Sequence, residues 1–418
     1  MIHMTKEKVC LIVPPDTFLL DPLMCPPLGP LYVAAILEQE GHDVLFLDLR
    51  VTSQIEKVTF PQVKYYGLTA TTADFNSVVE IKNLIKAQNP QSIVILGGVH
   101  ATVKPEESAK EFDAVVVGEG EKSIFKILHG ARGIVTSDVI ENIDTIPYPA
   151  RHLLEPNARF SRRAYKGQKH AETEIATSIT SSRGCPFNCS FCASPGMWNR
   201  KVRFRSPENF VDEVKYLIDA YGCTHFKMSD DNFSLNKERT LEISRLLEPL
   251  NIRFRCHTRV SLVDEEILSA LEAAGCNEIT FGIETTDDYI LEKLQKGETV
   301  ESQEHALRLT KDAGISVGIY LMAGLPFETW DTIHHLKEFI TRNKKYIDRY
   351  VLSTLAPFPG SDIYNNPEKY DIVWMEKNYD KFLLYNDKIL IATVDCTQKE
   401  LTEHRNELST FLKKVWSE

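Results

Sequence analysis

Short, almost continuously apolar runs alternate with longer amphipathic stretches along most of this 418-residue chain. Strands that are buried on both faces have this composition, and strands joined by helices pair in parallel through right-handed crossovers. In the first third, the apolar runs lie at 8–13, 43–49, 65–70, 92–96 and 114–118. The alternation therefore predicts an α/β fold that begins with a doubly wound, Rossmann-like sheet.

A segment with Pro147, Pro149 and Pro156 interrupts the alternation and predicts a connector. A second alternating series follows, with apolar runs near 174–182, 225–229, 252–257, 278–284, 315–322 and 349–355. Six strand–helix units are too few for a closed eight-unit barrel, and they predict a partial, open (β/α)6 barrel of TIM type. We therefore expect a Rossmann-like domain at 1–145, a linker at 146–173 and the partial barrel at 174–365. A small segment at 366–418 would close the barrel near the substrate.

Composition excludes several classes of function. The chain has 48 Lys and Arg against 59 Asp and Glu, and its formal net charge is −11. Such an acidic protein is poorly suited to bind nucleic acid or an anionic membrane. No apolar run reaches the roughly 18 residues of a membrane span, and the start of the chain favours a buried strand over an export signal. We expect a cytoplasmic protein whose nine cysteines are thiols or metal ligands.

The sharpest chemical signal is the segment 183–192, RGCPFNCSFC, which follows the first strand of the second series. Its cysteines, Cys185, Cys189 and Cys192, have the spacing C-x3-C-x2-C. Three thiolates on one loop can hold an iron–sulfur cube and leave one iron open for another ligand. Structural zinc is the alternative, but it takes four ligands, usually from paired C-x2-C units, and the sequence has no second pair.

This motif, placed at the first strand end of a partial barrel, resembles the radical S-adenosylmethionine (radical SAM) enzymes. The resemblance implies that Cys185, Cys189 and Cys192 are catalytic and hold a [4Fe–4S] cluster, whose open iron binds S-adenosylmethionine. An external reductant of flavodoxin or ferredoxin type would supply the electron that yields a 5′-deoxyadenosyl radical. By the same resemblance, Phe191 would pack near the adenine.

Later strand ends support the resemblance. Asp230 and Asp231 end the second strand, where the family contacts the methionyl amino group; the choice between them stays open, and a helix cap is the alternative. Arg259 ends the third strand and would bind the methionyl carboxylate or a substrate anion, with a surface ion pair as the alternative. Glu284 ends the fourth strand and would lie at the cofactor.

A doubly wound domain ahead of such a barrel resembles the cobalamin-binding branch of the superfamily. Ligands of such sheets bind beyond the carboxyl ends of the strands. The candidate residues at these ends are Thr69, Thr71, Gly97, Gly98, His100, Gly118, Glu119 and Gly120. The D-x-H-x-x-G segment that gives other cobalamin proteins a cobalt ligand is absent, and the nearby histidines are His100 and His42. A scaffold that binds nothing is the alternative for this domain.

The resemblance implies a class B methyltransferase-like enzyme. One S-adenosylmethionine would methylate cobalamin, and a second would give the radical that takes hydrogen from an unactivated carbon, which then receives the methyl group from methylcobalamin. The substrate would be a metabolite, a natural-product precursor, a peptide or a lipid. The alternatives are a cyclase or rearrangement enzyme of the same architecture, a methylthiotransferase and a non-catalytic sensor. A methylthiotransferase would need three N-terminal cysteines, where only Cys10 and Cys25 occur.

Overall fold

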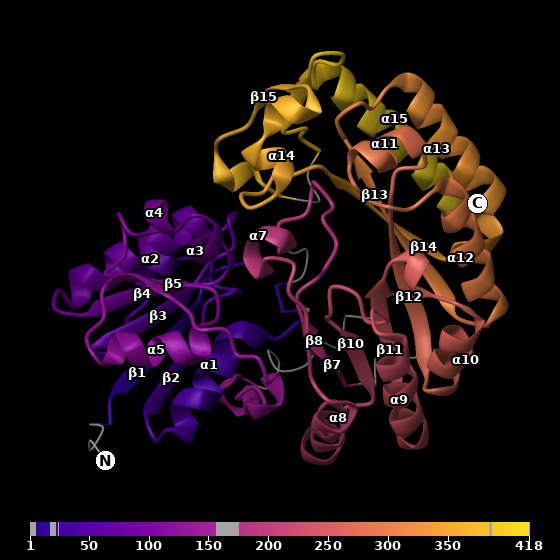
Figure 1. Cartoon of the computed structure of the whole chain (residues 1–418). Coiled ribbons are helices and arrows are strands. Elements are labelled where there is room, and N and C mark those ends of the chain that lie inside the picture. Colours follow the sequence, from indigo (N-terminus) through magenta and orange to yellow (C-terminus); the bar gives the residue numbers. More distant parts are fainter. Residues whose placement is uncertain (1–5, 17–21, 24, 156–174, 384–386, 418) are drawn as a thin grey trace. The chain divides into compact units, whose positions relative to one another are not determined.

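The computed structural model describes residues 6–16, 22–23, 25–155, 175–383 and 387–417. It divides the chain into two compact units, 1–177 and 178–418 (Figure 1). Each unit is built on one six-stranded sheet flanked by helices, so the predicted α/β fold class is confirmed. Most of the predicted linker, at 156–173, lies outside the described residues.

The first unit contains a parallel sheet with the strand order β2-β1-β3-β4-β5-β6. Its strands are β1 (Lys8–Val13), β2 (Asp43–Asp48), β3 (Tyr65–Thr69), β4 (Ile93–Gly97), β5 (Ala114–Val117) and β6 (Gly133–Thr136). Strand β6 was not predicted, because only Val135 of its four residues is buried and no apolar run marks it. The order reverses between β1 and β3, and the carboxyl edge at such a reversal is where doubly wound sheets bind ligands.

The helices of the first unit cover this sheet. They are α1 (Leu28–Gln39), α2 (Phe75–Gln88), α3 (Val99–Val103), α4 (Pro105–Ser108) and α5 (Gly120–Leu128). Leu37 of α1 and Ile124 of α5 pack in one buried cluster with Val9, Ile95 and Val116 of the strands. Because the strands are apolar on both faces, helices on each side remove them from water, and the carboxyl edge is left to the loops.

The second unit contains a sheet with the order β14-β13-β12-β11-β10-β7, so each strand lies beside the next one in the chain. Its strands are β7 (Ala176–Ile179), β10 (His225–Met228), β11 (Arg253–Thr258), β12 (Cys276–Glu284), β13 (Ser316–Ala323) and β14 (Arg349–Thr354). The pairings from β10 to β14 are parallel. This is the open arrangement of a partial barrel.

Helices follow the strands of the second unit and flank the curved sheet (Figure 1). They are α8 (Pro207–Tyr221), α9 (Lys237–Leu247), α10 (Glu265–Ala273), α11 (Asp288–Lys293), α12 (Val300–Asp312) and α13 (Trp330–Asn343). Burial alternates along β11, where Phe254, Cys256 and Thr258 are buried while Arg255 and His257 are only partly covered. One face of β11 therefore packs in the interior, and its other face carries Arg255 and His257.

The C-terminal part adds a small antiparallel sheet and a long helix. Strand β15 (Ile372–Met375) pairs with β16 (Ile391–Thr393), and α15 (Gln398–Ser417) contacts α13. Leu401 of α15 shares a buried cluster with residues at the ends of the barrel strands, so this part is packed on the barrel and is not a tail. None of the helices in the described ranges combines the length and the apolar character needed to cross a membrane.

Candidate active site

The three cysteines of the C-x3-C-x2-C motif lie on one loop between β8 (Ser182–Arg183) and α7 (Ser194–Trp198). Gly184 begins the loop with a φ of +95°, and a Cβ there would stand 2.0 Å from the carbonyl oxygen of Lys201. Only glycine allows both this backbone conformation and this approach. The loop is therefore folded back against the residues that lead into β9 (Arg203–Phe204).

Ser190 fixes the middle of this cysteine loop through its backbone. Its N–H donates to the carbonyl oxygen of Leu294 at 2.9 Å, and its own carbonyl oxygen accepts from the N–H of Ile363 at 3.0 Å. Asn188 adds a side-chain bond from Nδ2 to Oε1 of Gln295 at 2.9 Å. The loop is thus held between the segment after α11 and the short helix α14 (Asp362–Asn365), and its shape depends on protein contacts.

Each of the three sulfur atoms accepts a hydrogen bond from nitrogen. Nδ2 of Asn232 donates to Cys185 at 3.2 Å, Nη1 of Arg259 to Cys189 at 3.2 Å, and the backbone N–H of Ser194 to Cys192 at 3.4 Å. Such bonds stabilise a sulfur that carries negative charge, as it does when it binds metal. Three soft thiols with this support suit an iron–sulfur cluster.

Burial and neighbouring negative charges raise the pKa of two of these thiols. Burial is the main cause at both positions, and it raises the pKa of Cys192 to about 12 and that of Cys185 above its ordinary value. The carboxylate of Asp231 and the other thiols raise these pKa values further, so the cysteines lie close enough to interact electrostatically. Within the described ranges, no group of three or more His, Cys, Asp or Glu side chains is arranged to hold a single metal ion.

The next candidate residue on the loop is Phe191, which is partly buried. It packs against the apolar cluster that contains Leu294, Leu325 and Ile363. Its ring therefore lies between the cysteine loop and the segments that follow α11 and β13, on the side where the barrel strands end.

The two aspartates after β10 have different surroundings. Asp230 is buried and accepts from the backbone N–H of Ser181 at 3.1 Å, from Ser181 Oγ at 2.7 Å and from Ser182 Oγ. It joins the end of β10 to the chain after β7. Asp231 is exposed on one side and accepts one bond from Ser194 Oγ at 2.9 Å. Burial by the surrounding protein raises its pKa, and the charge of Asp230 raises it further. The geometry therefore leaves Asp231 as the carboxylate that faces the cysteine loop.

Arg259 lies in the interior and forms no surface ion pair, so that alternative for its role is wrong. The residue as a whole is 5% exposed. Besides its bond to Cys189, Nη2 donates to the carbonyl oxygen of Lys296, and Nε lies 3.3 Å from Oε1 of Glu298. The planar guanidinium thus connects the cysteine loop to the segment that follows α11.

Glu284 ends β12 in a strained conformation within a buried charge cluster. Its φ is +63°, which a non-glycine residue rarely adopts, and the pairing of β12 with β13 shifts beside it. Its Oε1 lies 3.9 Å from Nζ of Lys296. Burial raises the pKa of Glu284, the charge of Lys296 lowers it, and that of Glu298 raises it.

Lys296 and Glu298 are site residues that sequence reasoning missed. As whole residues they are 5% and 8% exposed, the Glu298 side chain is fully buried, and Nζ of Lys296 lies 3.7 Å from Oε2 of Glu298. In the sequence they stand in a polar segment after a short helix, where charges are usually solvated. The one available signal was Gly297 between them, whose φ of +66° brings the backbone close to Arg259.

In the first unit, the candidates at β3 and β4 form a cradle of small residues at the carboxyl edge. Gly98 has a φ of +92°, and a Cβ there would stand 2.6 Å from Oγ1 of Thr69. A Cβ on Gly97 would meet only distant atoms, the nearest at 3.9 Å. Thr71 donates from Oγ1 to Asp74 at 2.6 Å. Gly98 thus allows close packing against the end of β3, and the space beside Gly97 would let a bulky cofactor approach the backbone.

The candidate cofactor-binding residues after β5 take part in internal packing more than those at β3 and β4 do. Glu119 is buried and accepts from the backbone N–H of Ile140 at 3.1 Å. A Cβ on Gly120 would stand 2.8 Å from the side chain of Val33, so this glycine lets α5 approach α1. Gly118 has a φ of +88° and donates its N–H to Oγ1 of Thr102 at 3.1 Å.

The two histidines considered as cobalt ligands are both buried. His42 precedes β2 and so lies at the amino edge of the sheet, where it accepts from the N–H of Glu7 at 3.2 Å. His100 lies in α3 and not in a loop, with its ring stacked 4.0 Å from that of Phe75 and Nδ1 3.2 Å from Oγ1 of Thr72. Burial, aided by Lys104, lowers the pKa of His100 to about 4. In these conformations neither imidazole is presented to a ligand beyond the carboxyl edge.

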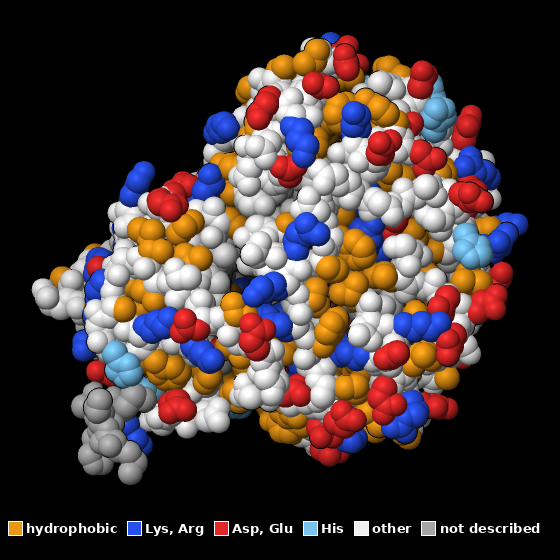
Figure 2. Space-filling model, in the orientation of Figure 1, with side chains coloured by type: hydrophobic (Ala, Val, Ile, Leu, Met, Phe, Trp, Pro, Cys, Tyr) orange, Lys and Arg blue, Asp and Glu red, His pale blue; other side chains and the backbone are white. Residues whose placement is uncertain are grey.

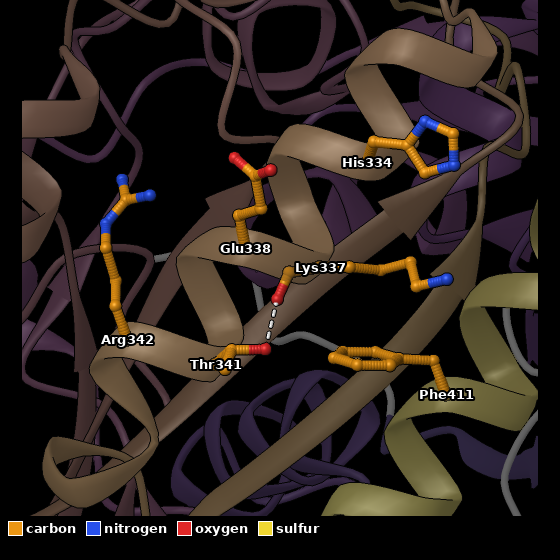
Figure 3. A pocket seen from close by; sticks show the side chains of 6 residues that line it. All are labelled: His334, Lys337, Glu338, Thr341, Arg342 and Phe411. Carbon is orange, nitrogen blue, oxygen red and sulfur yellow. Dashed lines mark hydrogen bonds between the residues drawn. The ribbon is translucent and has the colours of Figure 1, made fainter.

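A hollow of about 600 Å³ lies elsewhere, on the outer side of the second unit. Its walls come from α13 and α15 (Figure 3), and it is lined by His334, Lys337, Glu338, Thr341, Arg342 and Phe411. Lys337 pairs with Glu407 and Arg342 with Glu304. Basic and acidic side chains are also interspersed over the face in Figure 2. The hollow is thus a paired, solvated surface, and the chemistry-bearing residues lie at the strand ends.

Residues 179–340 match the radical SAM superfamily, and residues 22–127 match the B12 binding domain family. A protein of Pyrococcus horikoshii, named an uncharacterized methyltransferase, is 29% identical over 99% of this chain and 92% of its own length. An anaerobic magnesium-protoporphyrin IX monomethyl ester cyclase of Rubrivivax gelatinosus is 26% identical over 84% of this chain and 68% of its own length.

The fold is also similar to a solved structure. The radical S-adenosylmethionine methyltransferase TsrM from Kitasatospora setae, with cobalamin and a [4Fe–4S] cluster bound, superposes with a TM-score of 0.67 at 19% identity. The match covers 86% of this chain and 74% of that one. At this identity the likeness concerns the fold.

Proposed function

Because the chain belongs to the radical SAM superfamily and carries an N-terminal B12-binding domain, we propose that it methylates an unactivated carbon of a small molecule or peptide. It is a cobalamin-dependent radical SAM enzyme, and its cofactors are a [4Fe–4S] cluster, S-adenosylmethionine and cobalamin. The two domains together supply a methyl carrier and a means to activate a carbon–hydrogen bond.

The cysteine loop carries this proposal. Cys185, Cys189 and Cys192 hold the cluster, each through a sulfur that already accepts a hydrogen bond from nitrogen. When bound, the cluster supplies the electron that cleaves S-adenosylmethionine. Asp231 receives the methionyl ammonium, because its carboxylate faces the loop, while Asp230 is engaged by Ser181 and Ser182.

The middle of the cysteine loop and Arg259, which contacts it, are shielded from water. Cys189, Ser190 and Arg259 are 9%, 0% and 5% exposed. A dry wall on this side protects a reactive species from solvent and strengthens every electrostatic contact there. Glu284 and Lys296 extend the wall along the end of β12.

The carboxyl edge of the first unit receives the cobalamin. Its cradle at Thr69, Gly97 and Gly98 has the small side chains that a large macrocycle needs for close approach. His100 is packed against Phe75 and contributes to the core of the edge. A flavodoxin- or ferredoxin-type donor in the cytoplasm supplies the electrons.

Two observations favour methyl transfer over the alternatives. The relative that matches 99% of the chain is named a methyltransferase. Against a methylthiotransferase, Cys10 is a fully buried core residue of β1, and with Cys25 it gives only two cysteines in the first unit, where a second cluster would need three. The cyclase relative keeps ring closure as the second candidate.

Anaerobic reconstitution with iron, sulfide and cobalamin tests the proposal. With S-adenosylmethionine that carries a deuterated methyl group and dithionite, we expect 5′-deoxyadenosine, S-adenosylhomocysteine and labelled cobalamin. The Cys189→Ala variant is the control and should give no 5′-deoxyadenosine. Formation of 5′-deoxyadenosine without any loss of the methyl group would favour ring closure or rearrangement. The absence of 5′-deoxyadenosine from the reduced wild type would favour a sensor.

A further inference from the structure

The guanidinium of Arg259 is directed at the cysteine loop. Nη1 donates to the sulfur of Cys189 at 3.2 Å, and the central carbon lies 4.0 Å from the centre of the Phe187 ring. The side chain is buried. In a dry environment a cation that donates to a thiolate interacts far more strongly than it would in water, because little solvent screens the charges.

Two other contacts hold this guanidinium in place. Nη2 donates to the carbonyl oxygen of Lys296, and Nε forms an ion pair with Glu298, 3.3 Å from its Oε1, without a hydrogen bond. The Glu298 side chain is itself fully covered, at 0% exposure. Both Nη atoms of Arg259 therefore donate to protein atoms, and the rigid, planar guanidinium determines the direction of the bond to Cys189.

We infer that Arg259 is a positioning residue that raises the reduction potential of the [4Fe–4S] cluster through Cys189, and that it does not bind the methionyl carboxylate. Reduction adds one negative charge to the cluster. A cation and an N–H donor at a ligand sulfur stabilise the more negative state, so the potential rises. The inference rests on cluster binding by the three cysteines and is independent of which reaction follows.

Glu298 provides a test of sign. Its carboxylate partly offsets the charge of Arg259, so neutralising it should strengthen the positive field at Cys189 and raise the potential further. Neutralising Arg259 should lower the potential. If Arg259 only braced the loop, the two substitutions would loosen the same contact and would not shift the potential in opposite directions.

The experiment is a redox titration of the anaerobically reconstituted full chain, with dithionite and mediator dyes, followed by electron paramagnetic resonance of the reduced cluster. Arg259→Gln should move the midpoint to more negative values with its iron content unchanged, and Arg259→Lys should move it less. Glu298→Gln should move it to less negative values. Arg245→Gln, which removes an exposed cation paired with Glu242, is the matched control and should leave it unchanged.

An unchanged midpoint in Arg259→Gln with full iron, or a shift of Arg259→Gln and Glu298→Gln in the same direction, would overturn the inference. If Arg259→Gln holds no iron, the test rests on Glu298→Gln. A less negative midpoint potential in that variant supports the inference, and any other result overturns it. Binding of S-adenosylmethionine to Arg259→Lys, measured by equilibrium dialysis, should change by less than about threefold, since losing a carboxylate clamp costs roughly tenfold or more. A tenfold loss of S-adenosylmethionine binding would overturn the inference that Arg259 does not bind the methionyl carboxylate. A wild type that binds no cluster would instead refute the proposed function.

Discussion

At the scale of single residues, the adjacent Asp230 and Asp231 have different surroundings and different roles. Asp230 receives hydrogen bonds from two serines and joins two strand ends, while Asp231 has one bond and faces the cysteine loop. The sequence places both after a strand and cannot separate them, because the difference depends on Ser181 and Ser182, about fifty positions away in the chain.

Substitution of these aspartates by asparagine should separate their roles. Asp230→Asn leaves buried donors without a charged acceptor, and we expect the free energy of unfolding to fall by about 1–3 kcal/mol. Asp231→Asn should change it by less than roughly 0.5 kcal/mol while weakening binding of S-adenosylmethionine. Urea unfolding and equilibrium dialysis measure the two effects. Equal binding losses in both variants would contradict the assignment of Asp231.

Two buried titratable residues of the first unit should respond to pH in opposite directions. Burial raises the pKa of Asp74 to about 6, and burial lowers that of His100 to about 4. Between these values the folded state binds more protons than the unfolded state at Asp74 and fewer at His100. Stability from Asp74 therefore falls as the pH rises from about 4 to 6, whereas stability from His100 rises between about pH 4 and 6.5.

Each substitution should expose the slope of the other residue. In Asp74→Asn only the His100 effect remains, so between pH 4 and 6.5 the free energy of unfolding should rise by about 2–3 kcal/mol more than in the wild type. In His100→Gln only the Asp74 effect remains, so over the same range the free energy of unfolding should fall by about 2–3 kcal/mol relative to the wild type. Urea unfolding of the full chain at several pH values, relative to the wild type, measures this. Parallel pH profiles for the three proteins would show that neither group is perturbed as described.

At the scale of elements, α15 holds the loop after β13 through a buried pair. Nδ1 of His404 lies 3.2 Å from Oε1 of Glu328, whose other oxygen accepts from the N–H groups of Gly324 and Leu325. Burial raises the pKa of Glu328 above its ordinary value, and His404 lowers it. A helix from the end of the chain thereby shapes a strand-end loop of the barrel.

Removing His404 should loosen that loop. His404→Ala leaves the Glu328 carboxylate buried without one partner, and we expect a loss of about 1–3 kcal/mol of stability and faster amide hydrogen exchange at Gly324 and Leu325. Glu403→Ala, whose carboxylate belongs to a surface pair with Lys399, is the control and should change neither. Unchanged exchange in His404→Ala would mean that the loop keeps its shape without α15.

Sequence pattern recovered most elements, because burial on both faces and helix periodicity are local signals. The apolar run at 8–13 is strand β1 (Lys8–Val13), and the run near 252–257 is strand β11 (Arg253–Thr258). The sequence predictions missed a short strand and contacts that depend on the tertiary fold. Strand β6 lacks an apolar run, and the contacts of Lys296 and Glu298 with Arg259 arise only once the loop after α11 folds over the end of β11.

At the scale of the whole molecule, each unit has its own sheet and its own buried core. A sheet that is complete by itself does not need the other unit's cofactor in order to fold. We therefore expect Cys189→Ala to lose iron yet to retain the cobalamin bound by the wild type. Iron analysis and the visible spectrum of the bound corrin provide the measurement. Loss of cobalamin together with iron would show that the two sites depend on each other.

The backbone bonds of Ser190 have a consequence for damage by air. They attach the cysteine loop to Leu294 and Ile363 through main-chain groups and not through the sulfur atoms. An enzyme whose cluster has been destroyed by oxygen should therefore retain a receptive loop, because the scaffold around the lost inorganic core needs no rebuilding. Repair then requires only new iron and sulfide for the folded cysteine loop, and a cell can use the same polypeptide again without refolding it.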